Sequence, residues 1–144
     1  HWYIEGWADL KKKALEGGLQ SLDSPTRAIY DYSVSQVLHF DLRKGKDSIG
    51  CYMKIFPGKH DLLLEWPFCK VYTVGIIHPK DQSNVISQMV NPGNCKDGFQ
   101  QCFVRPKEKA NVACGTQTLT TAEKLEMGGF IQSNTLHLFL EIEP

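Results

Sequence analysis

The stretch IGCYMKIFPGKHDLLLEWPF, residues 49–68, decides the fold of this chain. Its first eight residues are rich in strand-forming side chains, and the turn residues PGKHD follow them, so it begins with a predicted β-strand. Pro67 lacks a backbone donor and favours an extended Trp66. The Trp-Pro-Phe sequence therefore predicts a corner between strands, from which Trp66 and Phe68 enter the core.

Upstream of this stretch, short apolar segments alternate with turn residues. Residues 1–7 predict a strand, and residues 7–18 predict a short helix that ends at two glycines. AIYDYSV (28–34) and QVLHFDLRKG (36–45) predict two further strands. The second of these is expected to form a hairpin with residues 48–56.

Downstream, VYTVGIIHP (71–79) predicts a buried strand. Residues 80–98 are polar and contain Asn-Pro-Gly-Asn and Asp-Gly, so they predict a long irregular loop. NVACGTQTLT (111–120) predicts a strand, and a short helix capped by Thr120 or Thr121 follows it. The last strand is expected to place Leu136, Leu138, Leu140 and Ile142 on one face.

These elements predict an all-β fold, an antiparallel β-sandwich of seven or eight strands with two short helices. The 144 residues are close to the usual size of one domain, and no linker or internal repeat divides them. We therefore expect a single domain over residues 1–144.

Composition bears on the class of partner. A formal net charge of zero argues against nucleic acid and against an anionic membrane surface. No apolar run approaches the ~20 residues that span a bilayer. The five cysteines are irregularly spaced, which favours reduced thiols and hence a cytoplasmic location.

The sequence offers little chemistry for catalysis. His39 precedes Asp41 and His60 precedes Asp61, but no local signature places a nucleophile beside either pair. The cysteines lie 18, 26, 7 and 12 positions apart, so no Cys-x2-Cys zinc motif occurs. We expect no enzyme activity, no metal and no cofactor, and we expect each cysteine to be a small buried apolar residue.

Several motifs spread along the chain share one resemblance. Residues of the opening stretch fit the signature Gly-x-x-Asp-x-Leu-Leu-x-Trp-Pro-Phe without a gap: Gly58, Asp61, Leu63, Leu64, Trp66, Pro67 and Phe68. Other matches are Trp2-x-Ile4, Ser24-Pro25, Phe103-x-Arg105-Pro106 and Asn111-Val112-Ala113-x-Gly115. Together they resemble the TRAF-C domain of the tumour-necrosis-factor-receptor-associated factors, within the MATH superfamily.

This resemblance implies an eight-stranded antiparallel β-sandwich that binds short extended peptides of receptor tails or adaptor proteins. The peptide would add as a strand to an edge, here Val112 to Thr118, where small residues let its backbone approach. The resemblance also implies a larger signalling or ubiquitin-ligase protein, and a homotrimer held by a coiled coil upstream of this sequence.

The residues that select the peptide depart from the family pattern. An Arg-x-Tyr pair is replaced by His39 and Asp41, so we expect a neutral or basic peptide residue beside Asp41. Three serines become Gln100, Gln101 and Cys102. The resemblance places these peptide-binding residues: His39, Asp41, Tyr52, Gln100, Gln101, Cys102, Phe103, Ala113, Cys114, Gly115 and Thr116.

Two alternatives remain open at this point. The sandwich could serve self-association or scaffolding with a blocked peptide edge, or it could bind sugar in the manner of a lectin. A bare edge at residues 112–118, with Tyr52 and Phe103 lining shallow pockets beside it, would favour peptide binding.

Overall fold

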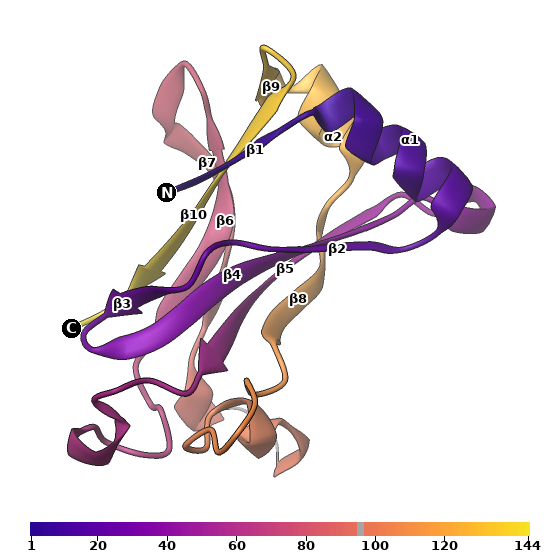
Figure 1. Ribbon diagram of the computed structural model, residues 1–144. Coiled ribbons are helices and arrows are strands. Elements are labelled where there is room, and N and C mark those ends of the chain that lie inside the picture. Colours follow the sequence, from indigo (N-terminus) through magenta and orange to yellow (C-terminus); the bar gives the residue numbers. More distant parts are fainter. Residues whose placement is uncertain (95–96) are drawn as a thin grey trace.

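The computed structural model describes the backbone of residues 1–94 and 97–144, and the side chains at all these positions except 94 and 97–99. Two antiparallel sheets pack face to face (Figure 1). One sheet contains β1 (Trp2–Glu5), β10 (Thr135–Ile142), β6 (Tyr72–His78) and β7 (Asp81–Val90), in that order, and β9 (Ile131–Gln132) pairs with β10. The other contains β2 (Gln20–Asp23), β4 (Tyr32–Asp41), β5 (Ser48–Phe56) and β8 (Cys114–Thr120), and β3 (Arg27–Ile29) pairs with β4.

This architecture confirms the predicted antiparallel sandwich with two short helices, α1 (Trp7–Gly17) and α2 (Ala122–Met127). The described residues form ten strands, because β3 and β9 are short additional ones. Short 3₁₀ turns connect the strands at Arg43–Gly45, Asp61–Leu63, Pro92–Asn94 and Asp97–Cys102.

The core forms from the inward faces of both sheets. Alternate residues of β4, β5, β6 and β10 are buried there, as the period-two pattern of a sheet requires. Among the completely covered side chains are Leu38, Phe40, Ile76, Leu136 and Leu138. Gln36 lies among these apolar residues, and its Nε2 donates to the carbonyl of Phe139 (2.8 Å), which links β4 of one sheet to β10 of the other.

Both helices close one end of the sandwich (Figure 1). Trp7 of α1 is buried and stacks on Phe40 with 5.0 Å between ring centroids. Its indole nitrogen donates to Glu126 of α2 (3.1 Å), which also pairs with Lys11 (2.8 Å). Hydrogen bonds from Lys11 and Trp7 lower the pKa of Glu126. The predicted cap of α2 is confirmed, since Thr121 accepts from the amide of Lys124 (3.1 Å).

The Trp-Pro-Phe segment is the corner that the sequence predicts. Phe68 is buried, and its amide donates to the carbonyl of Phe103 (2.7 Å). Tyr32 packs edge-on against Trp66 and against Phe68, with centroid distances of 5.2 and 4.9 Å. The Trp66 indole nitrogen donates to the carbonyl of Asp61 (2.8 Å), and the Trp66–Pro67 peptide bond is cis.

The predicted loop over residues 80–98 is wrong for its first half, because Asp81–Val90 form β7. This strand lies at a sheet edge, and almost all of its side chains are exposed. An edge strand with little buried surface needs few apolar residues, so its sequence lacks the usual strand pattern. The expectation for residues 95–96 lies outside the described residues.

The single strand predicted over residues 28–34 is also wrong. Tyr30 and Asp31 have positive φ angles of 49° and 68°, and they form a tight turn between β3 and β4. Turns of this kind are usually signalled by Asn-Gly or Asp-Gly, and the Tyr-Asp pair gives no such signal.

The expectation that the cysteines are buried holds at three positions. Cys51, Cys102 and Cys114 are buried, whereas Cys69 is exposed beside the Trp-Pro-Phe corner. Burial raises the pKa of the Cys51 thiol to about 11, so it is protonated at neutral pH. Cys95 lies outside the described residues.

Gly75, in the middle of β6, provides a test of the packing. A Cβ there would lie 2.5 Å from the carbonyl oxygen of Ile86 and 2.7 Å from the ring of Phe139. We expect Gly75→Ala to reduce the free energy of unfolding by about 1–3 kcal/mol through overpacking. Urea denaturation measures this. The control is Gly17→Ala, where a Cβ would meet only Gln20 Nε2 at 3.7 Å; equal stabilities of the two variants would contradict the prediction.

Candidate peptide-binding edge

Strand β8 forms one edge of its sheet. It pairs with β5 and with no other strand in the described part of the chain. Cys114, Gly115 and Thr116 lie opposite Met53, Tyr52 and Cys51. β7, the edge of the other sheet, approaches β8 along the same side of the sandwich. The predicted edge is therefore in place, with β8 beginning at Cys114 rather than at Val112.

Two glycines allow β8 to lie unusually close to β5. A Cβ on Gly115 would collide with the carbonyl oxygen of Cys51, and one on Gly50 would lie 2.8 Å from the carbonyl oxygen of Thr116. Between the pairs Cys51–Thr116 and Ile49–Thr120, three residues of β8 oppose Gly50 alone. This bulge, residues 117–119, directs Gln117 and Thr118 into solvent.

Side chains satisfy three backbone groups along β8. Tyr72 Oη donates to the carbonyl of Cys114 (2.8 Å), and Ser48 Oγ donates to the carbonyl of Gln117 (2.8 Å). The amide of Thr118 donates to Oγ1 of Thr116 (3.3 Å). These bonds fix the conformation of the edge without covering it by another strand.

A hollow of about 410 Å³ lies beside the bulge, and we call it the hairpin hollow. It brings together three predicted site residues, His39, Asp41 and Tyr52. The rings of His39 and Tyr52 lie 4.6 Å apart between centroids. Gln117 and Thr118, which belong to the expected peptide edge, also line it. The sequence did not indicate its other lining residues: Leu19, Lys46, Asp47, Ser48 and Gly50.

Asp41 is compensated within the chain. Its Oδ1 accepts from the amide and Nε of Arg43 (3.0 Å each), and its Oδ2 accepts from Nη2 (3.1 Å). These hydrogen bonds from Arg43 lower the pKa of Asp41 to about 2. The expectation that Asp41 disfavours acidic ligands assumed an unpaired carboxylate, and Arg43 removes the basis for it.

The second carboxylate of the hollow also has internal partners. Asp47 accepts from the amides of Ala122 (2.6 Å) and Glu123 (3.1 Å) at the start of α2. Lys46, whose side chain is 69% exposed, is 3.9 Å from Asp41 and extends toward solvent. The hairpin hollow is therefore not an anionic site.

Neutral aromatic groups form the floor of the hairpin hollow. Burial lowers the pKa of His39 below its ordinary value of 6.5, and the charge of Asp23 opposes this shift only in part. Burial also raises the pKa of Tyr52. At neutral pH, a ligand in this hollow meets an uncharged imidazole and an uncharged phenol.

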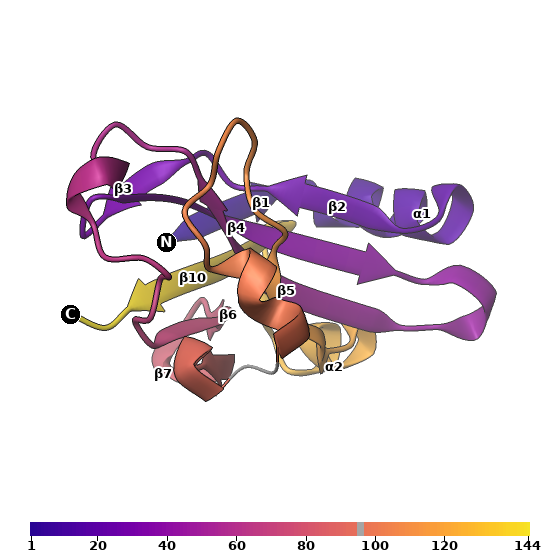
Figure 2. The same ribbon diagram turned by 90° about the horizontal axis from the view of Figure 1, so that it is seen from below.

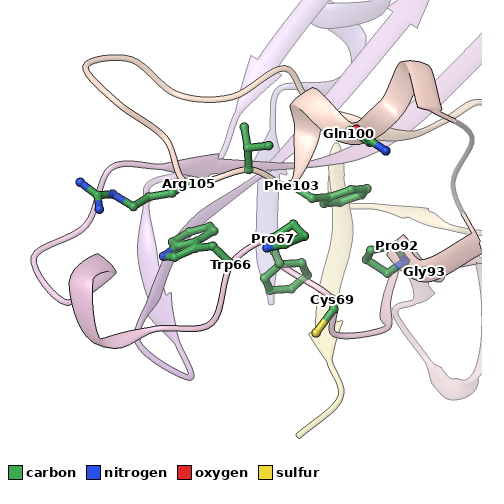
Figure 3. A pocket seen from close by; sticks show the side chains of 10 residues that line it. Trp66, Pro67, Cys69, Pro92, Gly93, Gln100, Phe103 and Arg105 are labelled. Atoms are coloured by element: carbon green, nitrogen blue, oxygen red, sulfur yellow. The ribbon is translucent and has the colours of Figure 1, made fainter.

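The remaining predicted residues lie toward the other end of β8. Gln100 and Phe103 line a second hollow of about 690 Å³, together with Trp66 and Pro67 (Figure 3). Cys102 is buried, and its thiol donates to the carbonyl of Ala113 (3.9 Å). Five of the predicted residues thus line the two hollows: His39, Asp41 and Tyr52 line one, and Gln100 and Phe103 line the other. The other six line neither hollow in the described structure: Gln101, which is exposed, and Cys102, Ala113, Cys114, Gly115 and Thr116.

No helix among the described residues has the length and apolar character needed to cross a membrane. The described residues also contain no group of three or more His, Cys, Asp or Glu side chains that could hold a metal ion.

Comparisons with known proteins bear on the family and the fold of this chain. A family model described as TRAF/meprin, MATH domain matches residues 27–139. The chain is 25% identical over 129 residues to TNF receptor-associated factor 2 of Homo sapiens. The matched region covers 87% of this chain and 25% of that protein. It thus spans a quarter of the length of that relative.

A solved structure of Notothenia coriiceps TRAF5 has the same fold, with a TM-score of 0.85 and 21% sequence identity. That similarity covers 99% of this chain and 72% of the other. Because the family model matches most of the sequence, from residue 27 to residue 139, the chain belongs to the TRAF/meprin MATH domain family.

Proposed function

We propose that this chain is the peptide-binding domain of an adaptor protein, and that a short extended segment of a receptor or signalling protein adds as a strand to β8. The observation that carries the proposal is the outer edge of β8, which pairs with no strand in the described residues and borders a hollow with the rings of His39 and Tyr52. Family membership supports an interaction domain, and the name of the human relative associates that protein with a receptor.

Strand addition needs a backbone that a peptide can approach. Ala113, Cys114, Gly115 and Thr116 carry small side chains, so the approach to the edge is open. Each backbone hydrogen bond contributes only about 0.5–1.5 kcal/mol net. The hairpin hollow at the bulge then supplies the choice of sequence, through the peptide side chain that enters it.

The chemistry of the hairpin hollow favours a neutral polar peptide side chain. His39 and Tyr52 offer hydrogen bonds without net charge, and Asp41 is held by Arg43. The exposed ammonium of Lys46 opposes a basic residue at this position. The sequence predicted a neutral or basic peptide residue beside Asp41. Because Lys46 disfavours the basic one, we expect a neutral residue there, with an amide or a hydroxyl group.

The setting of the domain is part of the same proposal. We infer a single domain over residues 1–144, a cytoplasmic location and partners among receptor tails or adaptor proteins, with neither nucleic acid nor membrane as ligand. A homotrimer through a coiled coil outside this sequence, and a role in ubiquitin ligation, rest on the family resemblance alone.

The edge can be tested by removing one donor. Thr118 lies in the bulge and has no register partner on β5, and its amide donates to Thr116 Oγ1, so Thr118→Pro removes a donor without removing a residue pair between β8 and β5. Peptides from an unbiased display selection should bind this variant at least about tenfold more weakly, by fluorescence anisotropy. The matched control is Ser83→Pro on β7, whose amide likewise donates to a side chain two residues earlier, Asp81 Oδ1 (3.0 Å).

Two results would count against strand addition. One is unchanged affinity of Thr118→Pro with the wild-type melting temperature; the other is an equal loss in Ser83→Pro. Hydrogen exchange on the unmodified chain provides a second measurement, because the bound peptide should protect amides of residues 114–118. A concentration-dependent dimer in sedimentation that excludes the peptide would instead indicate self-association through this edge.

The pKa of His39 yields a pH prediction. Because burial lowers this pKa from 6.5, the folded chain binds fewer protons at His39 than the unfolded chain does. The contribution of His39 to stability is therefore full above pH 6.5 and falls as the pH drops below it. NMR titration, with His39→Gln for assignment, should give a midpoint below 6.5; a midpoint at or above that value would show that the imidazole is not desolvated.

A further inference from the structure

The hollow beside the Trp-Pro-Phe corner, which we call the corner hollow, has the character of a separate binding site (Figure 3). Its volume of about 690 Å³ is within the ordinary range of ligand pockets. Trp66, Pro67 and Phe103 provide apolar walls, and Arg105 lies beside Trp66 at one end. It shares no lining residue with the hairpin hollow.

Hydrogen bonds hold the apolar wall in place. The indole nitrogen of Trp66 is already bonded to the carbonyl of Asp61 (2.8 Å), so the ring presents apolar surface. The amide of Phe68 is bonded to the carbonyl of Phe103 (2.7 Å), which joins the two sides of the hollow. Pro67 is exposed and rigid, so the hollow is preformed for an apolar side chain.

The segment that follows Phe103 is positively charged. Residues 104–113 contain Arg105, Lys107 and Lys109, with Glu108 as their one acidic residue. The three cations are exposed and form no ion pair or side-chain hydrogen bond with any residue that the structure describes. They line a depression of about 420 Å³ that adjoins the corner hollow at Val104 and Arg105.

Asn111 fixes this charged segment on the sandwich. Its side-chain amide donates to the carbonyls of Cys102 (3.1 Å) and Val104 (2.7 Å). Its own backbone amide donates to the carbonyl of Ile55 (2.8 Å). Both ends of the cationic segment are therefore anchored beside the apolar hollow.

Glu108 also lines this depression, so its lining carries three cations and one carboxylate. Two other acidic residues, on the Gly58–Cys69 segment, have partners there: Glu65 accepts from the thiol of Cys69 (3.5 Å), and Asp61 accepts from the amide of Gly58 (2.9 Å). In a chain of zero net charge, three cations that have no carboxylate partner among the described residues provide an attractive field for an acidic ligand.

We propose that the corner hollow binds an acidic segment of a partner protein. An apolar side chain enters between Trp66, Pro67 and Phe103, and a neighbouring carboxylate pairs with the guanidinium of Arg105 in a bidentate manner. Further acidic residues lie along the depression beside Lys107 and Lys109. The inference rests on the chain being an interaction domain, and it does not depend on strand addition to β8.

The test uses short labelled peptides with one leucine among glutamates, and anisotropy with the whole chain. Two control peptides replace the glutamates by lysines or the leucine by serine. The acidic leucine peptide should bind best, and its affinity should fall steeply as salt rises to about 0.3 M. Arg105→Gln should weaken it roughly tenfold, whereas Lys12→Gln, which removes a distant exposed charge, should not.

Val104→Glu supplies a second variant, because Val104 is 46% exposed and its replacement leaves the core intact. It places a carboxylate in the hollow and should also weaken the acidic peptide. The inference is overturned if either control peptide binds as well as the acidic leucine peptide, or if Arg105→Gln and Val104→Glu leave its affinity unchanged.

Thr118→Pro separates this site from the edge of β8. We expect that variant to bind the acidic leucine peptide normally while losing the display-selected peptides. A loss of both ligands in Thr118→Pro and in Arg105→Gln would show one continuous peptide groove and overturn a separate corner site. Normal binding of display-selected peptides by Thr118→Pro would instead contradict strand addition to β8 and would not contradict the proposal of a corner site.

Discussion

The hydrogen bond from the Phe68 amide to the carbonyl of Phe103 (2.7 Å) joins the two parts of the chain on which the binding surfaces depend. It ties the Trp-Pro-Phe corner to the segment that leads into β8. The rings of Phe68 and Phe103 are buried beside Tyr72, and Tyr72 in turn donates to the carbonyl of Cys114, the first residue of β8. The cluster of buried rings formed by Phe68, Tyr72 and Phe103 thus positions both the corner hollow and the beginning of the candidate peptide edge.

Charge is distributed differently at the two ends of β8. At the hairpin, Asp41 is bonded to Arg43 and Asp47 to the first amides of α2, so recognition there depends on shape and on neutral hydrogen bonds. At the corner, the cations of residues 105–109 have no carboxylate partners among the described residues. The same strand therefore separates a neutral surface from a cationic one.

The fold could be predicted from the sequence because the Trp-Pro-Phe corner and the hairpin of residues 36–56 are local patterns. Strand β7 could not, because an exposed edge buries little apolar surface and leaves no periodic signal. At the site, the sequence indicated His39, Asp41 and Tyr52, which share a hollow. It did not indicate the Arg43 partner of Asp41 or the bulge at residues 117–119, because both depend on a turn conformation and on close contact between β5 and β8.

The bonds of Asp47 also limit how this domain can vary among relatives. Hairpin tips usually tolerate insertions and deletions, because they are exposed and touch little else. Here the tip between β4 and β5 lies beside α1 (Figures 1 and 2), and Asp47 accepts the amides of Ala122 and Glu123 from a segment 75 residues away. One added residue before β5 would withdraw that carboxylate and leave the amides of Ala122 and Glu123 without this acceptor. The length of the turn between β4 and β5 is therefore constrained, although turns of this kind ordinarily tolerate changes in length.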